Sequence, residues 1–165
     1  QKSFINSLSK ELTKKLIIRL SPNDYGRDLN EYWSKNFPEI QIDNGEKSIT
    51  SLIRKSRLYV STYNATTYLE SLAWNVPTVI FWNPNYWELN QNASNLIKLL
   101  ESAGIFHRTP ESAVRHILKI WDDIPEWWDS SEVQEARTEF CKHYSYLPQK
   151  PLDKLESIFK EIIKS

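Results

Sequence analysis

The sequence has a single cysteine, no methionine and no excess of charge of either sign. With one cysteine, Cys141, the chain can form neither an internal disulfide nor a cysteine-rich zinc site, which is typical of proteins from a reducing cytosol. The three histidines also lack the spacing of metal ligands. We therefore expect a cytoplasmic protein without a bound metal.

The 21 basic and 21 acidic residues give a net charge of zero. A nucleic-acid-binding surface needs a basic surplus, so we expect no nucleic acid partner, although a local basic patch is compatible with this balance. No apolar run approaches the roughly 20 residues that span a bilayer, so no transmembrane segment is predicted. No signal peptide is visible at the start. Because methionine is absent even at position 1, we expect the sequence to be a piece of a longer protein.

Aromatic side chains, in contrast, are abundant: seven Trp, eight Tyr and six Phe. Aromatic rings can line a sugar site, but their usual place is the core. With 165 residues, 40% of them apolar, the chain is long enough to bury such a core in one domain.

Short apolar runs alternate with helical patterns along the first 125 residues. Before the first run, the spacing of the apolar residues predicts a helix over residues 3–14. Five apolar runs predict strands, over residues 15–20, 39–43, 58–61, 78–82 and 105–107. This alternation favours a Rossmann-like α/β fold, a doubly wound parallel sheet of about five strands.

The pattern changes after Pro125. Residues 126–148 lack strand signals and predict helix, and residues 151–164 predict a further amphipathic helix. The tryptophans of "EWW" (126–128) predict a hydrophobic clamp beneath these helices. We therefore divide the chain into a Rossmann-like domain, residues 1–125, and C-terminal helices, residues 126–165, that pack on it.

In a doubly wound sheet, ligands bind beyond the carboxyl ends of the strands. Three polar loops are expected there, at residues 21–28, 61–67 and 83–91. The loop after the third strand is the richest in hydroxyls and amides: Ser61, Thr62, Asn64, Thr66 and Thr67. It precedes a helix, and free N–H groups with the helix dipole form a natural anion site.

The same loop also has a purely structural interpretation. Thr67-x-x-Glu70 fits a capping box, in which each side chain satisfies a backbone N–H group at the start of the helix. Asn75 is predicted to end that helix in a left-handed conformation, and Pro77 prevents its continuation. The sequence pattern leaves the anion site and the cap as open alternatives.

A resemblance to known enzymes favours the anion site. "STYNATTYLESLAWNVPTVIF" (61–81) resembles the donor-binding signature of GT-B glycosyltransferases, with Thr66 and Thr67 at its Ser/Thr pair, Glu70 at its acidic position and Pro77 at its proline. "LNQNASNLIKLLESAGI" (89–105) resembles the Gln-x-x-Asn-Ala segment of peptidoglycan-type GlcNAc transferases, with compressed spacing. "LIIRLSPND" (16–24) resembles a strand end in polyol-phosphate transferases of teichoic acid synthesis.

The whole chain, including "GIFHRTPESAV" and "IPEWW", most resembles a family of surface-carbohydrate biosynthesis transferases known largely from spirochaetes. This resemblance implies the C-terminal, donor-binding half of a GT-B-like transferase. The donor would be a nucleotide-sugar or nucleotide-polyol, bound as substrate with no other cofactor, and the acceptor a glycan or lipid-linked molecule. The C-terminal helices would also pack toward a missing N-terminal domain, and the fragment alone would be inactive.

The resemblance also implies roles for single residues. Thr66 and Thr67 would hold the phosphates of the donor, and Glu70 would accept hydrogen bonds from ribose hydroxyls. Arg19 would neutralise a phosphate, unless it pairs with an acid at the edge of the core, and Arg27 is a weaker candidate for the same role. The sugar or polyol would be contacted by Glu88, Asn90 and Gln91.

The chain departs from these families at several positions. Ser21 replaces the histidine of the polyol-phosphate transferases, Asn75 replaces the usual glycine, and Tyr63-Asn64 replaces a small pair. No catalytic base is assigned: Asp24 is a loop carboxylate without a visible partner. His107 either lines the site or, the commoner role of a lone histidine, makes structural hydrogen bonds. No DxD-type motif lies near a strand end, so metal-independent binding is expected.

Two other functions remain compatible with the sequence. A nucleotide-sugar 2-epimerase-like enzyme would have the same architecture, but it needs more acids and histidines around the polar loops. A non-catalytic Rossmann-like interaction domain would use the loop after the third strand only as a cap, and loss of Glu70 would then reduce stability rather than affinity. Fold alone cannot distinguish these functions.

Overall fold

The computed structural model describes residues 1–23, 26–146, 148 and 150–164, so Asp24 lies outside the described residues. Its five strands are β1 (Ile17–Arg19), β2 (Gln41–Asp43), β3 (Tyr59–Ser61), β4 (Thr78–Phe81) and β5 (Phe106–His107). The helices before β4 are α1 (Lys2–Ser7), α2 (Lys10–Thr13), α3 (Leu29–Asn36), α4 (Ile49–Lys55) and α5 (Thr66–Ala73). Those after β4 are the 3₁₀ turn η1 (Pro84–Tyr86), α6 (Gln91–Ser102), α7 (Pro110–Ile120), α8 (Ile124–Trp128), α9 (Ser131–Tyr144) and α10 (Pro151–Lys164).

The described strands form two small parallel sheets rather than one sheet of five. β1 pairs with β2, while β3, β4 and β5 pair in that order. The mixed α/β character and the parallel pairing agree with the sequence, but the continuous five-stranded sheet does not form among the described residues. Ile18 of β1 and Val60 of β3 pack on the same hydrophobic cluster. Side-chain packing, rather than a shared ladder of hydrogen bonds, therefore joins the two sheets.

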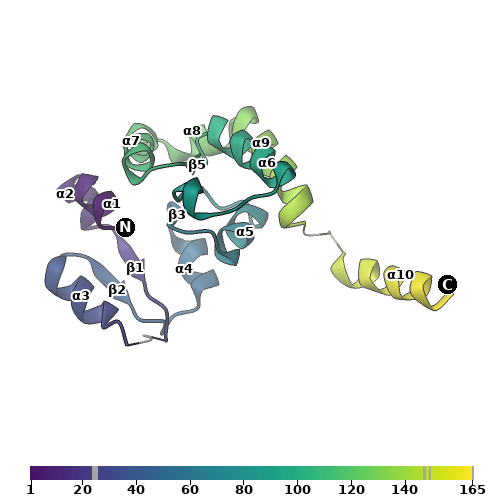
Figure 1. Cartoon of the computed structure of the whole chain (residues 1–165), viewed down its shortest axis with the longest axis horizontal. Helices are drawn as coiled ribbons and strands as arrows, with labels where there is room; N and C mark the ends of the chain where they lie inside the picture. Colours follow the sequence, from purple (N-terminus) through teal and green to yellow (C-terminus); the bar gives the residue numbers. More distant parts are fainter. Residues whose placement is uncertain (24–25, 147, 149, 165) are drawn as a thin grey trace.

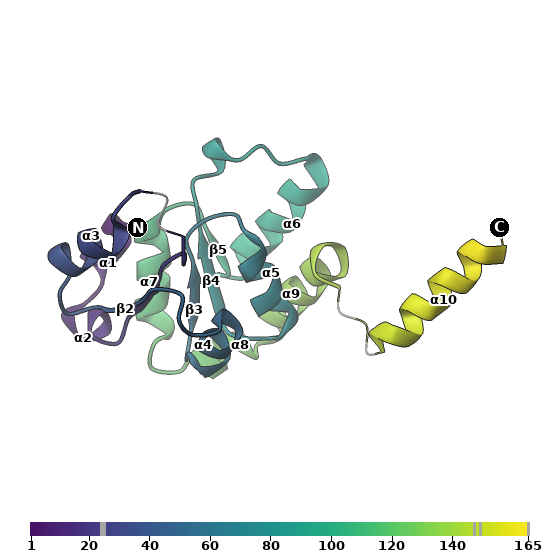
Figure 2. The same cartoon turned by 90° about the horizontal axis from the view of Figure 1, so that it is seen from below.

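Strand β4 lies at the centre of the fold, with α7 on one side and α5 on the other (Figure 2). Its residues alternate between two hydrophobic clusters, as period-2 geometry requires. Val79 and Phe81 belong to a cluster with α1, α3 and α7. Ile80 and the following Trp82 belong to the other, with α5, α6, α8 and α9. This two-sided burial explains why "TVIFW" is apolar at almost every position.

Serine caps divide two of the predicted helices. The helix expected over 3–14 ends at Ser7, and Ser9 starts α2 by accepting a hydrogen bond from the Leu12 N–H at 3.3 Å. The helix expected over 126–148 is likewise split into α8 and α9, and the Ser130 side chain caps α9. A serine hydroxyl competes for backbone N–H groups, which favours a new helix start over continuation.

The helix α9 runs antiparallel to α5. Arg137 of α9 donates a hydrogen bond to the carbonyl of Leu72 near the end of α5, at 2.9 Å. One turn later, the ring of Phe140 faces Tyr68 in the first turn of α5, with centroids 6.3 Å apart. Trp128 is 3% exposed and belongs to the same hydrophobic cluster as the buried residues of α9, as the clamp prediction requires. The end of α9 consequently lies beside the start of α5.

The last helix, α10, has the predicted bounds and stands apart from the rest of the molecule in both views (Figures 1 and 2). Its apolar residues are exposed: Leu152, Leu155, Ile158, Phe159, Ile162 and Ile163. Among the residues that the structure describes, no helix is both long enough and apolar enough to cross a bilayer.

Candidate functional site

The polar side chains at the end of β3 and in the loop after it have partners within the loop, in α5 and at Gln1. Ser61 is buried, and its hydroxyl donates to the carbonyl of Tyr63 at 3.2 Å. Thr62 Oγ1 accepts from the Gln1 amide at 2.7 Å. Asn64 Oδ1 accepts from the Tyr68 hydroxyl at 2.9 Å. These three side chains therefore shape the loop and fix its path into α5.

The helix α5 begins without a side-chain cap. Its N-cap residue is Ala65, which has extended backbone angles and no side chain that could accept a hydrogen bond. The predicted capping box is thus wrong: Thr67 is the second residue of the helix, and Glu70 lies beyond the first turn. The chain enters the helix two residues earlier than a Thr67 cap requires. The first N–H groups of α5 remain available to an acceptor, where the helix dipole favours an anion.

Beside this helix start lies a cleft of about 290 Å³. One wall is a stripe along α5, in which Thr66, Glu70 and Trp74 follow each other at four-residue spacing, with Leu69 and Ala73 between them. The other wall is the end of α9 and the residues after it: Tyr144, Ser145 and Tyr146. Thr66 and Glu70 are both exposed, so a ligand in the cleft can reach their side chains.

Two tyrosines near this helix start are shielded from solvent: Tyr59 of β3 is half-buried and Tyr68 of α5 is buried. Burial raises the pKa of Tyr59, the hydroxyls of Ser61 and Thr67 offset part of the rise, and Tyr63 and, least, Glu70 add to it. Burial and nearby Tyr144 raise the pKa of Tyr68 to about 12. Both phenols are therefore neutral hydrogen-bond donors at neutral pH.

Tyr59, Tyr144 and Tyr146 were not predicted as site residues. A signal for Tyr59 was present, because alternation along β3 puts Tyr59 and Ser61 on the same face of the sheet. No local signal pointed to Tyr144 and Tyr146, since they reach the site only through the packing of α9 on α5.

The predicted residues after β4 belong to a separate loop that arches from β4 to α6 (Figure 2). Asn90 is the N-cap of α6, where its Oδ1 accepts from the Ala93 N–H at 2.8 Å. Gln91 donates from its amide to Asn95 Oδ1 at 3.2 Å. Glu88 is exposed. Two of the three side chains thus have local partners.

The two predicted arginines lie apart from the α5 cleft. Arg19 forms a salt bridge with Asp43 at the ends of β1 and β2, which matches the structural alternative for this residue. Burial acts to raise the pKa of Asp43, but the hydrogen bond and charge of Arg19, together with the backbone N–H groups of Lys47 and Gly45, outweigh it, so the pKa is lowered. Arg27 borders a different cleft of about 460 Å³, with Glu31 and Lys35.

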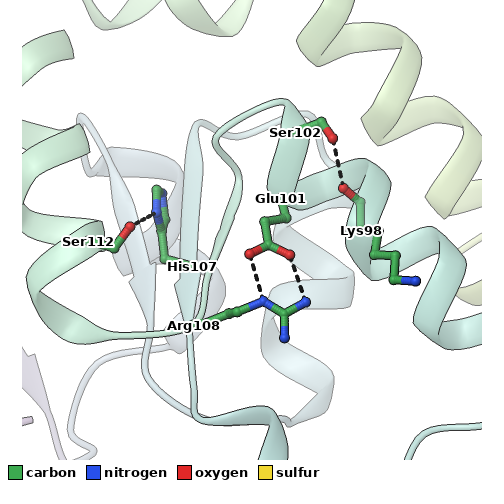
Figure 3. A network of polar contacts seen from close by, with 6 residues as sticks. All are labelled: Lys98, Glu101, Ser102, His107, Arg108 and Ser112. Carbon is green, nitrogen blue, oxygen red and sulfur yellow. Dashed lines mark hydrogen bonds and ion pairs between the residues drawn. The ribbon is translucent and has the colours of Figure 1, made fainter.

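His107 makes structural hydrogen bonds (Figure 3). Its Nε2 lies 2.9 Å from the Gly104 carbonyl, which can only accept, so Nε2 carries the proton. Its Nδ1 then accepts from the Ser112 hydroxyl at 3.0 Å. Burial lowers the pKa of His107, which favours this neutral form. Both ring nitrogens are occupied, so the ring has no free base for catalysis. The adjacent Arg108 makes a two-pronged ion pair with Glu101.

The neighbouring His116 makes stability depend on pH. Burial, followed by the charges of His107 and Lys119, lowers the pKa of His116 to about 4. Because the folded pKa lies below the unfolded value of about 6.5, acid favours the unfolded chain. The stabilisation is complete above pH 6.5 and is lost as the pH falls toward 4. We expect a loss of about 1 kcal/mol between pH 7 and pH 5, after allowing for the partial exposure of the ring.

Urea unfolding of the wild type, His116→Gln and His143→Gln at the two pH values tests this expectation. His143 lies on the outside of α9 and serves as the matched control. The loss should shrink in His116→Gln and persist in His143→Gln. An equal loss in all three proteins would show that His116 does not determine the pH dependence.

Within the residues that the structure describes, no group of three or more His, Cys, Asp or Glu side chains could hold a metal ion. A family model described as "LIC12162 family transferase" matches residues 1–159. No curated protein and no solved structure matches the chain.

Proposed function

Because the chain belongs to the LIC12162 family of transferases, we propose that it binds the nucleotide-activated donor of a GT-B-like transferase in surface polysaccharide biosynthesis. The full enzyme would move a sugar or polyol phosphate from a nucleotide donor to a glycan or lipid-linked acceptor. This chain would orient the donor and stabilise the diphosphate that leaves.

The uncapped start of α5 is the observation that carries this proposal. An N-terminus without a side-chain acceptor offers backbone N–H groups to an anion, and the helix dipole adds a partial positive charge. The hydroxyl of Thr66 is exposed beside these groups. Preorganised donors of this kind stabilise negative charge that develops on a leaving group.

The exposed carboxylate of Glu70 is suited to ribose hydroxyls, which donate hydrogen bonds. Because α5 is not capped by Glu70, the two roles do not compete for one side chain. Arg19 is engaged by Asp43, so the phosphate contact in our proposal rests on α5 rather than on β1. Glu88 remains the proposed contact to the sugar or polyol, since Asn90 and Gln91 bond within α6.

His107 is hydrogen-bonded at both ring nitrogens and cannot serve as the general base for the acceptor. That base would therefore come from outside the loop after β3 and the start of α5. The chain alone is therefore expected to bind the donor without turning it over. GT-B enzymes often supply the base from their acceptor-binding domain, which fits a donor-binding role for this chain.

Titration of the chain with UDP, CDP, GDP and CMP by calorimetry tests the proposal. One nucleotide should bind saturably, and Thr66→Ala and Glu70→Ala should each weaken it about tenfold, the order of a hydrogen bond to a charged group. Melting temperatures should stay close to that of the wild type, because neither side chain caps α5.

Glu135→Ala is the matched control, since Glu135 is an exposed carboxylate on α9 that does not line the cleft. It should bind like the wild type. Absence of binding to every nucleotide at millimolar concentration would contradict the proposal. A large fall in the melting temperature of Glu70→Ala would support the interaction-domain alternative.

A further inference from the structure

The cleft beside α5 is lined by three aromatic side chains and one carboxylate. Trp74 comes from the end of α5, and Tyr144 and Tyr146 come from the end of α9 and the residues after it. The three rings and Glu70 line the same cleft, although Trp74 and Tyr146 are 72 residues apart in sequence (146 − 74). The packing of α9 against α5 therefore creates a composite surface that neither segment has alone.

Two of these rings are held in place by the fold. Trp74 lies under the guanidinium of Arg54, 5.2 Å from the ring centroid. Tyr144 packs against Phe140 with centroids 5.2 Å apart and is near the hydroxyl of Tyr68. Tyr146, the third ring that lines the cleft, is 66% exposed. The rings are thus presented to a ligand without a large rearrangement of the chain.

Along α5, the residues that line the cleft are arranged in the same order as the phosphate, ribose and base of a nucleotide. Thr66 is at the helix start, Glu70 is one turn further along α5, and Trp74 is another turn further. Each step of four residues advances about 6 Å along a helix. A nucleotide whose phosphate lies at the start of α5 would place its ribose beside Glu70. Its base would then lie beside Trp74 and the two tyrosines.

The chemistry of the lining suits a planar base, because the rings of Trp74, Tyr144 and Tyr146 offer flat faces for stacking. The side chains of Thr66, Glu70 and Ser145, the two tyrosine hydroxyls and the indole N–H group can bond to the polar edges of a nucleoside. The volume of about 290 Å³ is just below the roughly 300–1,000 Å³ of small-molecule pockets, so it suits part of a donor rather than the whole.

We infer that this cleft holds the nucleoside of the donor, with the base stacked on Tyr144 and Tyr146 and bordered by Trp74, and the ribose hydroxyls on Glu70. The inference rests on the proposed donor-binding function. It assigns recognition of the base to the end of α9 and the residues after it, at positions 144–146, rather than to the loops that follow the strands.

Calorimetric titration of the whole chain with UDP, CDP, GDP and inorganic diphosphate tests the inference, in the wild type and in Tyr146→Ala. Because Tyr146 is largely exposed, its removal should leave the fold intact. Base–aromatic stacking of the usual strength predicts a loss of about tenfold or more in nucleotide affinity. The affinity for inorganic diphosphate should not change, since in this inference Tyr146 contacts the base and not the phosphates.

Tyr144→Leu is the second variant, because leucine keeps apolar contact with Phe140 but removes the ring. Leu118→Ala, on the exposed side of α7, is the control and should bind every ligand like the wild type. Preferential loss of nucleotide over diphosphate in both tyrosine variants supports the inference.

Failure of the inference is distinguishable from failure of the proposed function. If a nucleotide binds the wild type, binds Thr66→Ala much more weakly and binds Tyr146→Ala unchanged, the proposed donor-binding function stands. The placement of the base on Tyr144 and Tyr146 is then overturned. Equal weakening of nucleotide and diphosphate by Tyr146→Ala would also overturn it. Absence of any nucleotide binding to the wild type would overturn both proposals.

Discussion

The variant Gly104→Ala is expected to lose about 3 kcal/mol of unfolding free energy, one of the largest effects of a single methyl group in this protein. Gly104 ends α6 with a φ of +74°, a left-handed conformation that disfavours every side chain. A Cβ there would lie 2.6 Å from Cε1 and 2.9 Å from Nε2 of His116. The imidazole is flanked by the rings of His107 and Trp127, so it has little room to retreat.

The two parts of this effect can be measured separately. Gly26→Ala is the matched control, because its φ is +70° and nothing lies within 4 Å of the added Cβ. It should cost about 1 kcal/mol, the conformational part alone. A double-mutant cycle with His116→Ala should recover most of the steric part of Gly104→Ala. Equal losses in Gly26→Ala and Gly104→Ala by urea unfolding would show that the imidazole moves aside freely.

Asn75→Ala is expected to cost about 3 kcal/mol through a different mechanism. Asn75 ends α5 with a φ of 56°, and its Oδ1 accepts from Trp128 Nε1 at 3.0 Å and from Gln134 Nε2 at 3.1 Å. The alanine loses both hydrogen bonds and also strains the left-handed backbone. The GT-B signature that this segment resembles has glycine at this position, and these hydrogen bonds give a physical reason for asparagine here.

Two further variants separate the contributions at position 75. Asn75→Gly relieves the strain but loses the side-chain oxygen, so it should cost about 1–2 kcal/mol. Asn75→Asp keeps an acceptor for both donors and should remain closest to the wild type. Urea unfolding with equal m values gives the comparison. A glycine variant as stable as the wild type would mean that the two side-chain hydrogen bonds contribute nothing net.

The sequence predicted well those features that depend on neighbouring residues. The start of α7 at Thr109-Pro110 is confirmed, since a capping oxygen followed by proline is a local signal. The left-handed conformation of Asn75 is confirmed for the same reason. The bounds of α10 also follow directly from its apolar spacing. All five strands lie within their predicted ranges.

Features that depend on distant residues could not be predicted in this way. The split into two sheets depends on which strands pair, and strand pairing is decided in three dimensions. The partners of Asn75 are 53 and 59 residues away in sequence. Tyr144 and Tyr146 reach the candidate site only through the antiparallel packing of α9. The capping box failed for a local reason, because the motif does not specify which residue enters the helix first.

The central position of β4 has a consequence for how the molecule opens to solvent. Val79 and Ile80 are 0% exposed, and β4 is hydrogen-bonded along both edges. Exchange of their amide hydrogens with water therefore requires cooperative unfolding of the domain. The helix α10 lies at the other extreme, because an isolated helix of 14 residues is only marginally stable in water. The free energy of local opening is thus expected to be highest at β4 and lowest at α10. The end of α9, where we place the base of the donor, is the last packed segment before α10.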